Sequence, residues 1–259
     1  MILTVDIGNT NTVVGIFKGE ELIESVRLES NRSKTVDEYH LLLTDLLDLK
    51  DIDIESFEGG IISSVVPTLT GTMEKAVSKI IGREPIVVGP GTKTGLNIMY
   101  DDPKEVGADR IVNAVGALKK YGAPLIIIDF GTATTYCVID KDKNYLGGII
   151  APGIGISAEA LFLKAAKLPR VDLVPPENYL NKNTVDAIKA GIIFGRVGEV
   201  EYIVKHLKEE VGVTNAKVIS TGGIAPTING LTKAIDIYDK NLTLFGLRDI
   251  YEKNTKNRK

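Results

Sequence analysis

The feature of this chain that most constrains its fold is an internal duplication. Residues 5–12 (VDIGNTNT) align without a gap with residues 128–135 (IDFGTATT). In each copy an apolar run ends in Asp-x-Gly and a polar turn, which predicts two strands joined by a tight turn. A second, shorter similarity aligns residues 62–64 (ISS) with residues 219–221 (IST). Because the two offsets differ, we infer a diverged duplication with an insertion and not a tandem array.

Each copy begins a similar run of expected elements. In the first half, hydrophobic periodicity predicts strands at 2–5, 12–17, 22–28, 60–66 and 85–88 and helices at 35–49, 67–81 and 106–121, with a loop over 89–102. In the second half it predicts strands at 125–129, 134–139, 145–150, 217–220 and 235–238, and helices at 157–167 and 184–211, the latter interrupted near Gly191 or Gly195. We therefore predict an α/β protein of two similar domains, residues 1–121 and 122–259, with a cleft between them.

Composition excludes several classes of protein. Lys and Arg number 31 and Asp and Glu 34, so no basic surplus indicates a nucleic-acid partner. The basic segment 253–259 is interpreted as a solubilising tail. One cysteine, Cys137, excludes an internal disulfide, and no apolar run approaches the roughly 18 residues of a membrane span. The start of the chain lacks the pattern of a signal peptide. We expect a soluble cytoplasmic protein that acts without membrane or nucleic acid.

The duplicated Asp-x-Gly turn has a chemical rationale. Glycine permits a tight turn whose backbone N–H groups can form an anion-binding concavity, and the hydroxyls of Thr10 and Thr12 can add donors. The aspartate, Asp6, offers a hard oxygen to the Mg²⁺ that accompanies nucleotide phosphates. A single copy is more often a hairpin whose aspartate caps backbone N–H groups. Two copies favour a site that holds a triphosphate.

These motifs resemble those of a known family. Duplicated strand–turn–strand phosphate loops are similar to those of the actin-like ATPase and sugar-kinase superfamily, whose domains are ribonuclease-H-like. Within it, residues 6–10 (DIGNT), 107–110 (GADR) and 129–135 (DFGTATT) resemble type III pantothenate kinases, in matching order over roughly residues 1 to 250. The resemblance implies two ribonuclease-H-like domains with an inter-domain nucleotide cleft. It also implies ATP-dependent phosphorylation of pantothenate to 4'-phosphopantothenate, the first step of coenzyme A biosynthesis, by a homodimer that needs Mg²⁺ and a monovalent cation, K⁺ or NH₄⁺.

The same resemblance assigns roles to individual residues. For ATP binding it implies Asp6, Ile7, Gly8, Asn9, Thr10, Asn11, Thr12, Val13 and Thr132. For pantothenate it implies Tyr100, Gly107, Ala108, Asp109, Arg110 and Thr184. Asp109 matches the general base and Asp129 the monovalent-cation ligand, and Asp6 is the candidate for Mg²⁺.

Each of these residues also has a structural interpretation. Asp109 and Thr184 stand where helices are expected to begin, so either is an ordinary helix cap. Arg110 fits a solvated helix charge, or a guanidinium that pairs with pantothenate's carboxylate. For Tyr100 the structural interpretation is an aromatic side chain that packs against its neighbours. Residues 153–158 (GIGISA) match a dinucleotide-binding pattern, but the hairpin-like strands before them argue against a βαβ unit.

Other functions stay open on the sequence alone. A regulator that kept the fold without catalysis is one, and a kinase for acetate or a sugar, or a polyphosphate phosphatase, is another. The helix 184–211 carries an apolar stripe of Ile188, Ile192, Ile193 and Val197. This stripe either forms the dimer interface or covers its own sheet.

Overall fold

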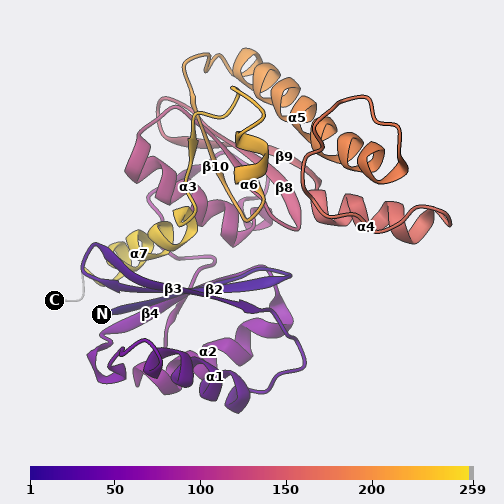
Figure 1. The fold of residues 1–259 in the computed structure, drawn as a ribbon. Helices are drawn as coiled ribbons and strands as arrows, with labels where there is room; N and C mark the ends of the chain where they lie inside the picture. Colours follow the sequence, from indigo (N-terminus) through magenta and orange to yellow (C-terminus); the bar gives the residue numbers. More distant parts are fainter. Residues whose placement is uncertain (257–259) are drawn as a thin grey trace. The chain divides into compact units, whose positions relative to one another are not determined.

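The computed structural model describes residues 1–256 and divides the chain into two compact units (Figure 1). The first unit comprises residues 1–95, 101–116 and 241–259, and the second comprises residues 96–100 and 117–240. Neither unit is one continuous stretch of chain. The predicted contiguous division into residues 1–121 and 122–259 therefore differs from these units, because the last helix of the chain packs with the first sheet.

The first unit is built on a five-stranded sheet in the order β3-β2-β1-β4-β5. Its strands are β1 (Ile2–Ile7), β2 (Asn11–Lys18), β3 (Glu21–Glu29), β4 (Gly59–Ser64) and β5 (Ile86–Val87). The first three form antiparallel hairpins, whereas β4 and β5 run parallel to β1. The three consecutive strands predicted at the start of the chain are thus confirmed.

Helices cover both faces of this sheet. Helices α1 (Val36–Asp48) and α2 (Pro67–Ile81) lie on one face, and α7 (Leu242–Thr255) lies on the other (Figure 1). Helix α1 begins with a capping box between Thr35 and Glu38, and Pro67 opens α2, as its N1 position allows. Two short 3₁₀ helices, η1 (Ile54–Ser56) and η2 (Pro103–Glu105), and the first part of α3 (Ala108–Tyr121) complete the unit.

The second unit repeats this sheet with one addition. Its strand order is β11-β10-β7-β8-β9-β6, from β6 (Asn97–Ile98), β7 (Leu125–Phe130), β8 (Ala133–Ile139), β9 (Asn144–Pro152), β10 (Lys217–Thr221) and β11 (Ile237–Tyr238). Strands β7, β8 and β9 are antiparallel, and β10 and β11 run parallel to β7. This matches the first sheet strand for strand, and β6 adds an edge strand. The predicted duplication is confirmed.

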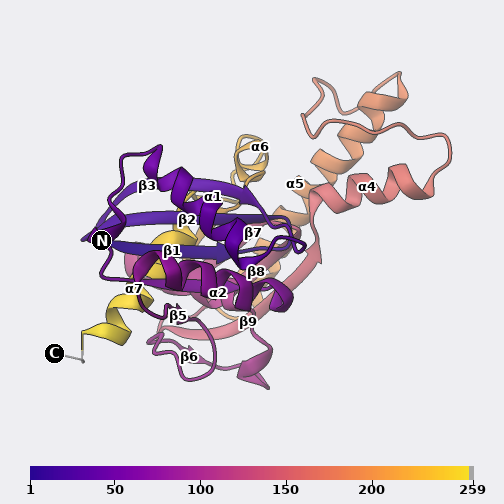
Figure 2. The same ribbon diagram turned by 90° about the horizontal axis from the view of Figure 1, so that it is seen from below.

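The helices of the second unit pack mainly through α5 (Thr184–Glu210). Its buried residues Ile193, Val200 and Val204 join a core with β7, β8, β10 and the short helix α6 (Ala225–Asn229). Helix α4 (Ile154–Lys164) contacts α5. Figure 2 shows that α4, the 165–183 connection and the start of α5 extend beyond the edge of the second sheet.

Three expectations about the helices were wrong. Helix α5 is not interrupted at Gly191 or Gly195, because burial of one face along its length outweighs the helix cost of glycine. Residues 242–255, which carried no helix prediction, form α7. The expected basic tail is partly this helix, in which Lys253 donates to the Thr94 carbonyl at 2.9 Å, while residues 257–259 lie outside the described part of the chain.

Candidate functional site

The first candidate phosphate turn is the β1–β2 hairpin. Asp6, near the end of β1, lies opposite Val13 on β2 and Ser63 on β4. The Gly8 N–H donates to the Asn11 carbonyl at 3.0 Å, so Asn9 and Thr10 form a two-residue connection. Both connecting residues are exposed, whereas Ile7 is fully buried. The polar tip of this hairpin is therefore the part that a ligand can reach.

The segment after β3 supports this turn and contains a residue that the sequence analysis missed. The Thr12 side chain is fully buried with its hydroxyl 2.9 Å from that of Ser30, and its role as a ligand donor stays a prediction. The Ser30 N–H donates to the Thr10 carbonyl at 3.0 Å. Arg32 donates to the Asn9 side chain at 3.1 Å, which brings a positive charge to the turn. Arg32 lies 20 or more residues along the chain from the motif, and only the hairpin pairing brings it there.

The second candidate phosphate turn is one residue shorter than the first. Asp129 on β7 lies opposite Thr135 on β8 and Thr221 on β10. The Gly131 N–H donates to the Ala133 carbonyl at 3.1 Å, which leaves Thr132 as the single, exposed connecting residue. The gapless alignment of the two motifs therefore fails after the glycine, where the second hairpin has lost one residue.

Two glycines from distant parts of the chain pack against this second turn. A Cβ on Gly153, just before α4, would lie 2.2 Å from the Thr132 carbonyl oxygen and 2.5 Å from that of Gly131. A Cβ on Gly222, after β10, would lie 2.5 Å from the Phe130 carbonyl oxygen, and its φ of +96° also favours glycine. The GIGISA segment, rejected as a dinucleotide motif, thus has a packing role at its first glycine.

Residues 107–110 form a preorganised corner at the start of α3. The Asp109 carboxylate accepts the Arg110 backbone N–H at 2.7 Å and folds back over Gly107, where a Cβ would lie 2.6 Å from the carboxylate oxygen. Arg110 is 8% exposed and donates to the Glu105 carbonyl at 3.3 Å. Arg110 is therefore not the solvated helix charge that was the structural alternative.

The electrostatics of Asp109 differ from the sequence expectation. The helix start was expected to favour the ionised carboxylate. Instead, burial raises the pKa of Asp109 above its ordinary value of 3.8, although the Arg110 backbone N–H and charge act in the opposite direction. Burial is the larger effect because the carboxylate loses most of its contact with water. A carboxylate with a raised pKa is a stronger base once it is ionised.

Tyr100 and Thr184, the remaining expected pantothenate contacts, belong to the second unit. The Tyr100 ring lies over the backbone of Gly147 on β9, with ring carbons 3.5 and 3.7 Å from where a Cβ would stand. Thr184 is exposed as the first residue of α5, and the cap of that helix is Asn183, which accepts the Asp186 N–H at 2.9 Å. Thr184 is thus not the helix cap that the sequence suggested as an alternative.

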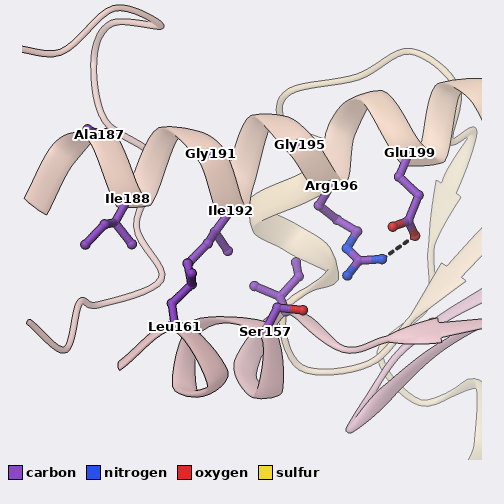
Figure 3. A pocket seen from close by; sticks show the side chains of 10 residues that line it. Ser157, Leu161, Ala187, Ile188, Gly191, Ile192, Gly195, Arg196 and Glu199 are labelled. Atoms are coloured by element: carbon purple, nitrogen blue, oxygen red, sulfur yellow. Dashed lines mark hydrogen bonds and ion pairs between the residues drawn. The ribbon is translucent and has the colours of Figure 1, made fainter. Parts of the chain in front are cut away.

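A groove of about 440 Å³ lies between α4 and α5 (Figure 3). Leu161, Ile188 and Ile192 line it with aliphatic side chains, and Gly191 and Gly195 contribute none, which keeps it open. Arg196 and Glu199 form an ion pair at one end of it. Ile193, part of the predicted interface stripe, is instead fully buried in the core of its own unit.

Within residues 1–256 there is no cluster of three or more His, Cys, Asp or Glu side chains suited to a metal ion. In that same range no helix has the length and apolar character needed to cross a bilayer. The candidate carboxylates come from different hairpins, Asp6 from the first and Asp129 from the second. Mg²⁺ bound with a nucleotide takes most of its ligands from phosphate and water, so one carboxylate fits that role.

Comparisons with known proteins converge on one family. A family model described as type III pantothenate kinase matches residues 2–206. A Geobacillus kaustophilus protein described as type III pantothenate kinase is 52% identical over 255 residues, which cover 98% of this chain and 98% of that protein.

Solved structures agree on the fold. A Campylobacter jejuni structure described as a Baf family transcriptional activator has 19% identity, a TM-score of 0.60 and coverage of 98% of this chain and 99% of that chain. A ROK hexokinase from Thermus thermophilus has 11% identity, a TM-score of 0.50 and 99% coverage of both chains. At these identities the two structures show a shared fold and say nothing of substrate.

Proposed function

The chain belongs to the type III pantothenate kinase family, and from that premise we propose how its residues phosphorylate pantothenate. The reaction transfers the terminal phosphoryl group of ATP to the primary hydroxyl of pantothenate and opens the route to coenzyme A. Because the reaction consumes ATP, we place it in the cytoplasm. The observation that carries the assignment of residues is the corner at 107–110, where a buried arginine and a basic carboxylate are adjacent.

Asp109 is the general base. An alcohol is a poor nucleophile until its proton is taken as the bond to phosphorus forms, and a carboxylate within hydrogen-bond reach accepts that proton. Arg110 pairs with the pantothenate carboxylate, since a guanidinium can donate two parallel hydrogen bonds to it. The Arg110 side chain is already fixed by burial and by the Glu105 carbonyl, so little side-chain entropy is lost on binding. Tyr100 and Thr184 supply further pantothenate contacts.

The two hairpin turns contact the nucleotide. In the first turn the exposed backbone and side chains of Asn9 and Thr10, with Arg32 beside them, suit phosphate oxygens. Asp6 is the residue that would hold the Mg²⁺ that accompanies the nucleotide. In the second turn, Thr132 contacts the nucleotide and Asp129 would hold the monovalent cation. When bound, these cations neutralise charge on the phosphate groups.

The test is an ATP-consumption assay on the purified protein with pantothenate, acetate, a hexose or no acceptor. We expect consumption with pantothenate alone, at a rate that depends on K⁺ or NH₄⁺. Consumption with the hexose and none with pantothenate would contradict the assignment. Asp109→Asn serves as the matched control, because it keeps the size of the side chain and removes the basic oxygen.

We also propose that the enzyme is a homodimer joined through α4 and α5. Within residues 149–185 several large apolar side chains are exposed, among them Ile150, Leu163, Val174, Tyr179 and Leu180. The groove beside them contains a buried donor, Arg196 Nε, that has no hydrogen-bond partner within the described residues. A second copy of this chain would cover the apolar side chains and fill the groove, which favours association.

Light scattering at micromolar concentration tests the dimer. We expect twice the 28.0 kDa chain mass for the wild type and a shift toward the single-chain mass for Ile188→Glu, which puts a charge in the groove. The matched control is Leu49→Glu, which adds the same charge at a residue that is 77% exposed in the first unit. A single-chain mass for the wild type would rule out the dimer.

A further inference from the structure

An ionic cluster around the buried Arg196 ties α5 to the two strands that follow the second phosphate turn. Arg196 is 7% exposed, and its guanidinium pairs with Glu199 one turn along α5 and donates to the Pro152 carbonyl (Figure 3 shows the Arg196–Glu199 pair). Tyr136 on β8 donates its hydroxyl to the same Glu199 carboxylate at 3.0 Å. All four residues belong to the second unit. The cluster therefore holds β8 through Tyr136 and the end of β9 through Pro152.

The point that Arg196 holds is next to the turn. Pro152 is paired in register with Ala133, the residue that leaves the turn. The following residue, Gly153, donates its N–H to the Thr132 carbonyl at 3.0 Å and allows the close approach described above. The carbonyl that Arg196 binds and the N–H that contacts Thr132 thus belong to the same peptide unit, between Pro152 and Gly153.

Arginine is chemically suited to this position. Its planar guanidinium presents several donors in a fixed geometry, so it can bind the Glu199 carboxylate and the Pro152 carbonyl at once. A lysine ammonium is a compact charge without this fork. The Arg196 side chain is buried, whereas that of Glu199 is 32% exposed. Removing Glu199 therefore leaves a buried guanidinium without its carboxylate partner, and removing Arg196 takes away the link between α5 and the Pro152 carbonyl.

We propose that Arg196 is a positioning residue for the Gly131–Ala133 turn, acting through Pro152 and Gly153. This inference rests on the proposed nucleotide contact by Thr132. Arg196 touches no substrate in this scheme. Its loss lets the end of β9 and the start of α4 move away from the turn, which loosens the contact with ATP and leaves the pantothenate contacts as they are.

The experiment separates positioning from general stability through the two Michaelis constants. We expect Arg196→Met to raise the KM for ATP at least tenfold while the KM for pantothenate stays within twofold. Arg196→Lys and Glu199→Gln, which each keep part of the cluster, should raise the KM for ATP by smaller factors. The matched control is Arg83→Met, because Arg83 also donates to a backbone carbonyl, that of Glu58 at 2.9 Å, in the first unit. It should leave both constants unchanged.

Equal rises in both constants, or no rise in either, would overturn the positioning role. If Arg196→Met does not fold, the lysine and glutamine variants are judged by the same criterion. Thr132→Ala separates the positioning role of Arg196 from the proposed nucleotide contact by Thr132. A rise in the KM for ATP in Thr132→Ala but not in the Arg196 variants overturns the positioning role alone. No change in either set overturns the nucleotide role of the turn as well.

Discussion

Replacing Gly153 with alanine tests directly how closely the second turn is packed. The new Cβ would lie 2.2 Å from the Thr132 carbonyl oxygen and 2.5 Å from that of Gly131, whereas ordinary contacts begin near 3.4 Å. The turn and the start of α4 must therefore separate by about 1 Å. Because both obstructing atoms are backbone, no change of rotamer relieves the overlap.

The expected cost follows from that displacement. Overpacking of this kind destabilises a protein by about 1–3 kcal/mol. A misplacement of about 1 Å in a reacting geometry costs on the order of 10²-fold in rate. We therefore expect Gly153→Ala to lower kcat/KM for ATP about 10²-fold and to lower the melting temperature by several degrees.

The assay varies ATP at saturating pantothenate and records thermal unfolding in parallel. Gly155→Ala is the matched control, two residues further on, because its Cβ would meet no atom within 4 Å. This variant should keep wild-type kinetics and gain up to about 1 kcal/mol from the better helix propensity of alanine. A Gly153→Ala enzyme with kcat/KM for ATP within threefold of wild type would refute the packing argument.

Three further predictions concern the base, the metals and the first unit. Asp109→Asn should lower kcat on the order of 10²–10⁴-fold and remove the acid limb of the kcat/KM–pH profile, which in the wild type falls as the pH drops through the raised pKa of Asp109. Because the pKa of Asp109 is higher in the folded protein than in the unfolded chain, ionisation of Asp109 opposes folding. The wild type therefore loses stability relative to the variant as the pH rises from 3.8 through the raised pKa. Thermal unfolding at pH 7 should find the variant more stable. Asp129→Asn should abolish the difference between potassium and tetramethylammonium salts in steady-state assays, whereas Asp6→Asn should lower activity in both. Gly246→Ala should destabilise the protein by about 1–3 kcal/mol in denaturant unfolding, because its Cβ would lie 2.1 Å from a backbone oxygen of α3. The control Gly71→Ala in α2, where a Cβ would meet no atom within 4 Å, should stabilise the protein by up to about 1 kcal/mol.

Each of these has a result that contradicts it. A near wild-type kcat for Asp109→Asn at saturating potassium and Mg-ATP would mean that the base lies elsewhere. Equal wild-type activity in the two salts would remove the cation role from Asp129. Loss of stability in Gly71→Ala as large as that in Gly246→Ala would mean that the close helix contact is not the cause.

The elements that were predicted well share strong local signals. The hairpins at the start of each half follow from apolar runs closed by glycine-containing turns, and α2 begins at Pro67, a residue type favoured at the first helical position. Helix α7 gave no such signal. Its Leu244, Gly246, Leu247 and Ile250 are buried on more than one side, so no single stripe repeats at the helical period.

The residues proposed for the candidate site were chosen on a similar local signal, and their roles stay predictions. Asp6, Asp129 and the 107–110 corner stand in short motifs whose members are neighbours along the chain. Arg32 was missed because it reaches Asn9 across more than twenty residues. The assignments to Tyr100 and Thr184 stay predictions, and they rest on the family and not on a local signal.

By itself, the sequence determined the duplicated strand–turn–strand plan and the α/β class, because these depend on periodicity and on residues close together along the chain. Its short motifs also resembled those of the family that the comparisons then showed. Only the tertiary structure decided that Arg110 is buried, that burial raises the pKa of Asp109, and that Gly153 and Arg196 support the second turn. These properties arise where distant segments exclude water and meet at contact distance. No local pattern in the sequence encodes such a meeting, and it exists only once the chain has folded.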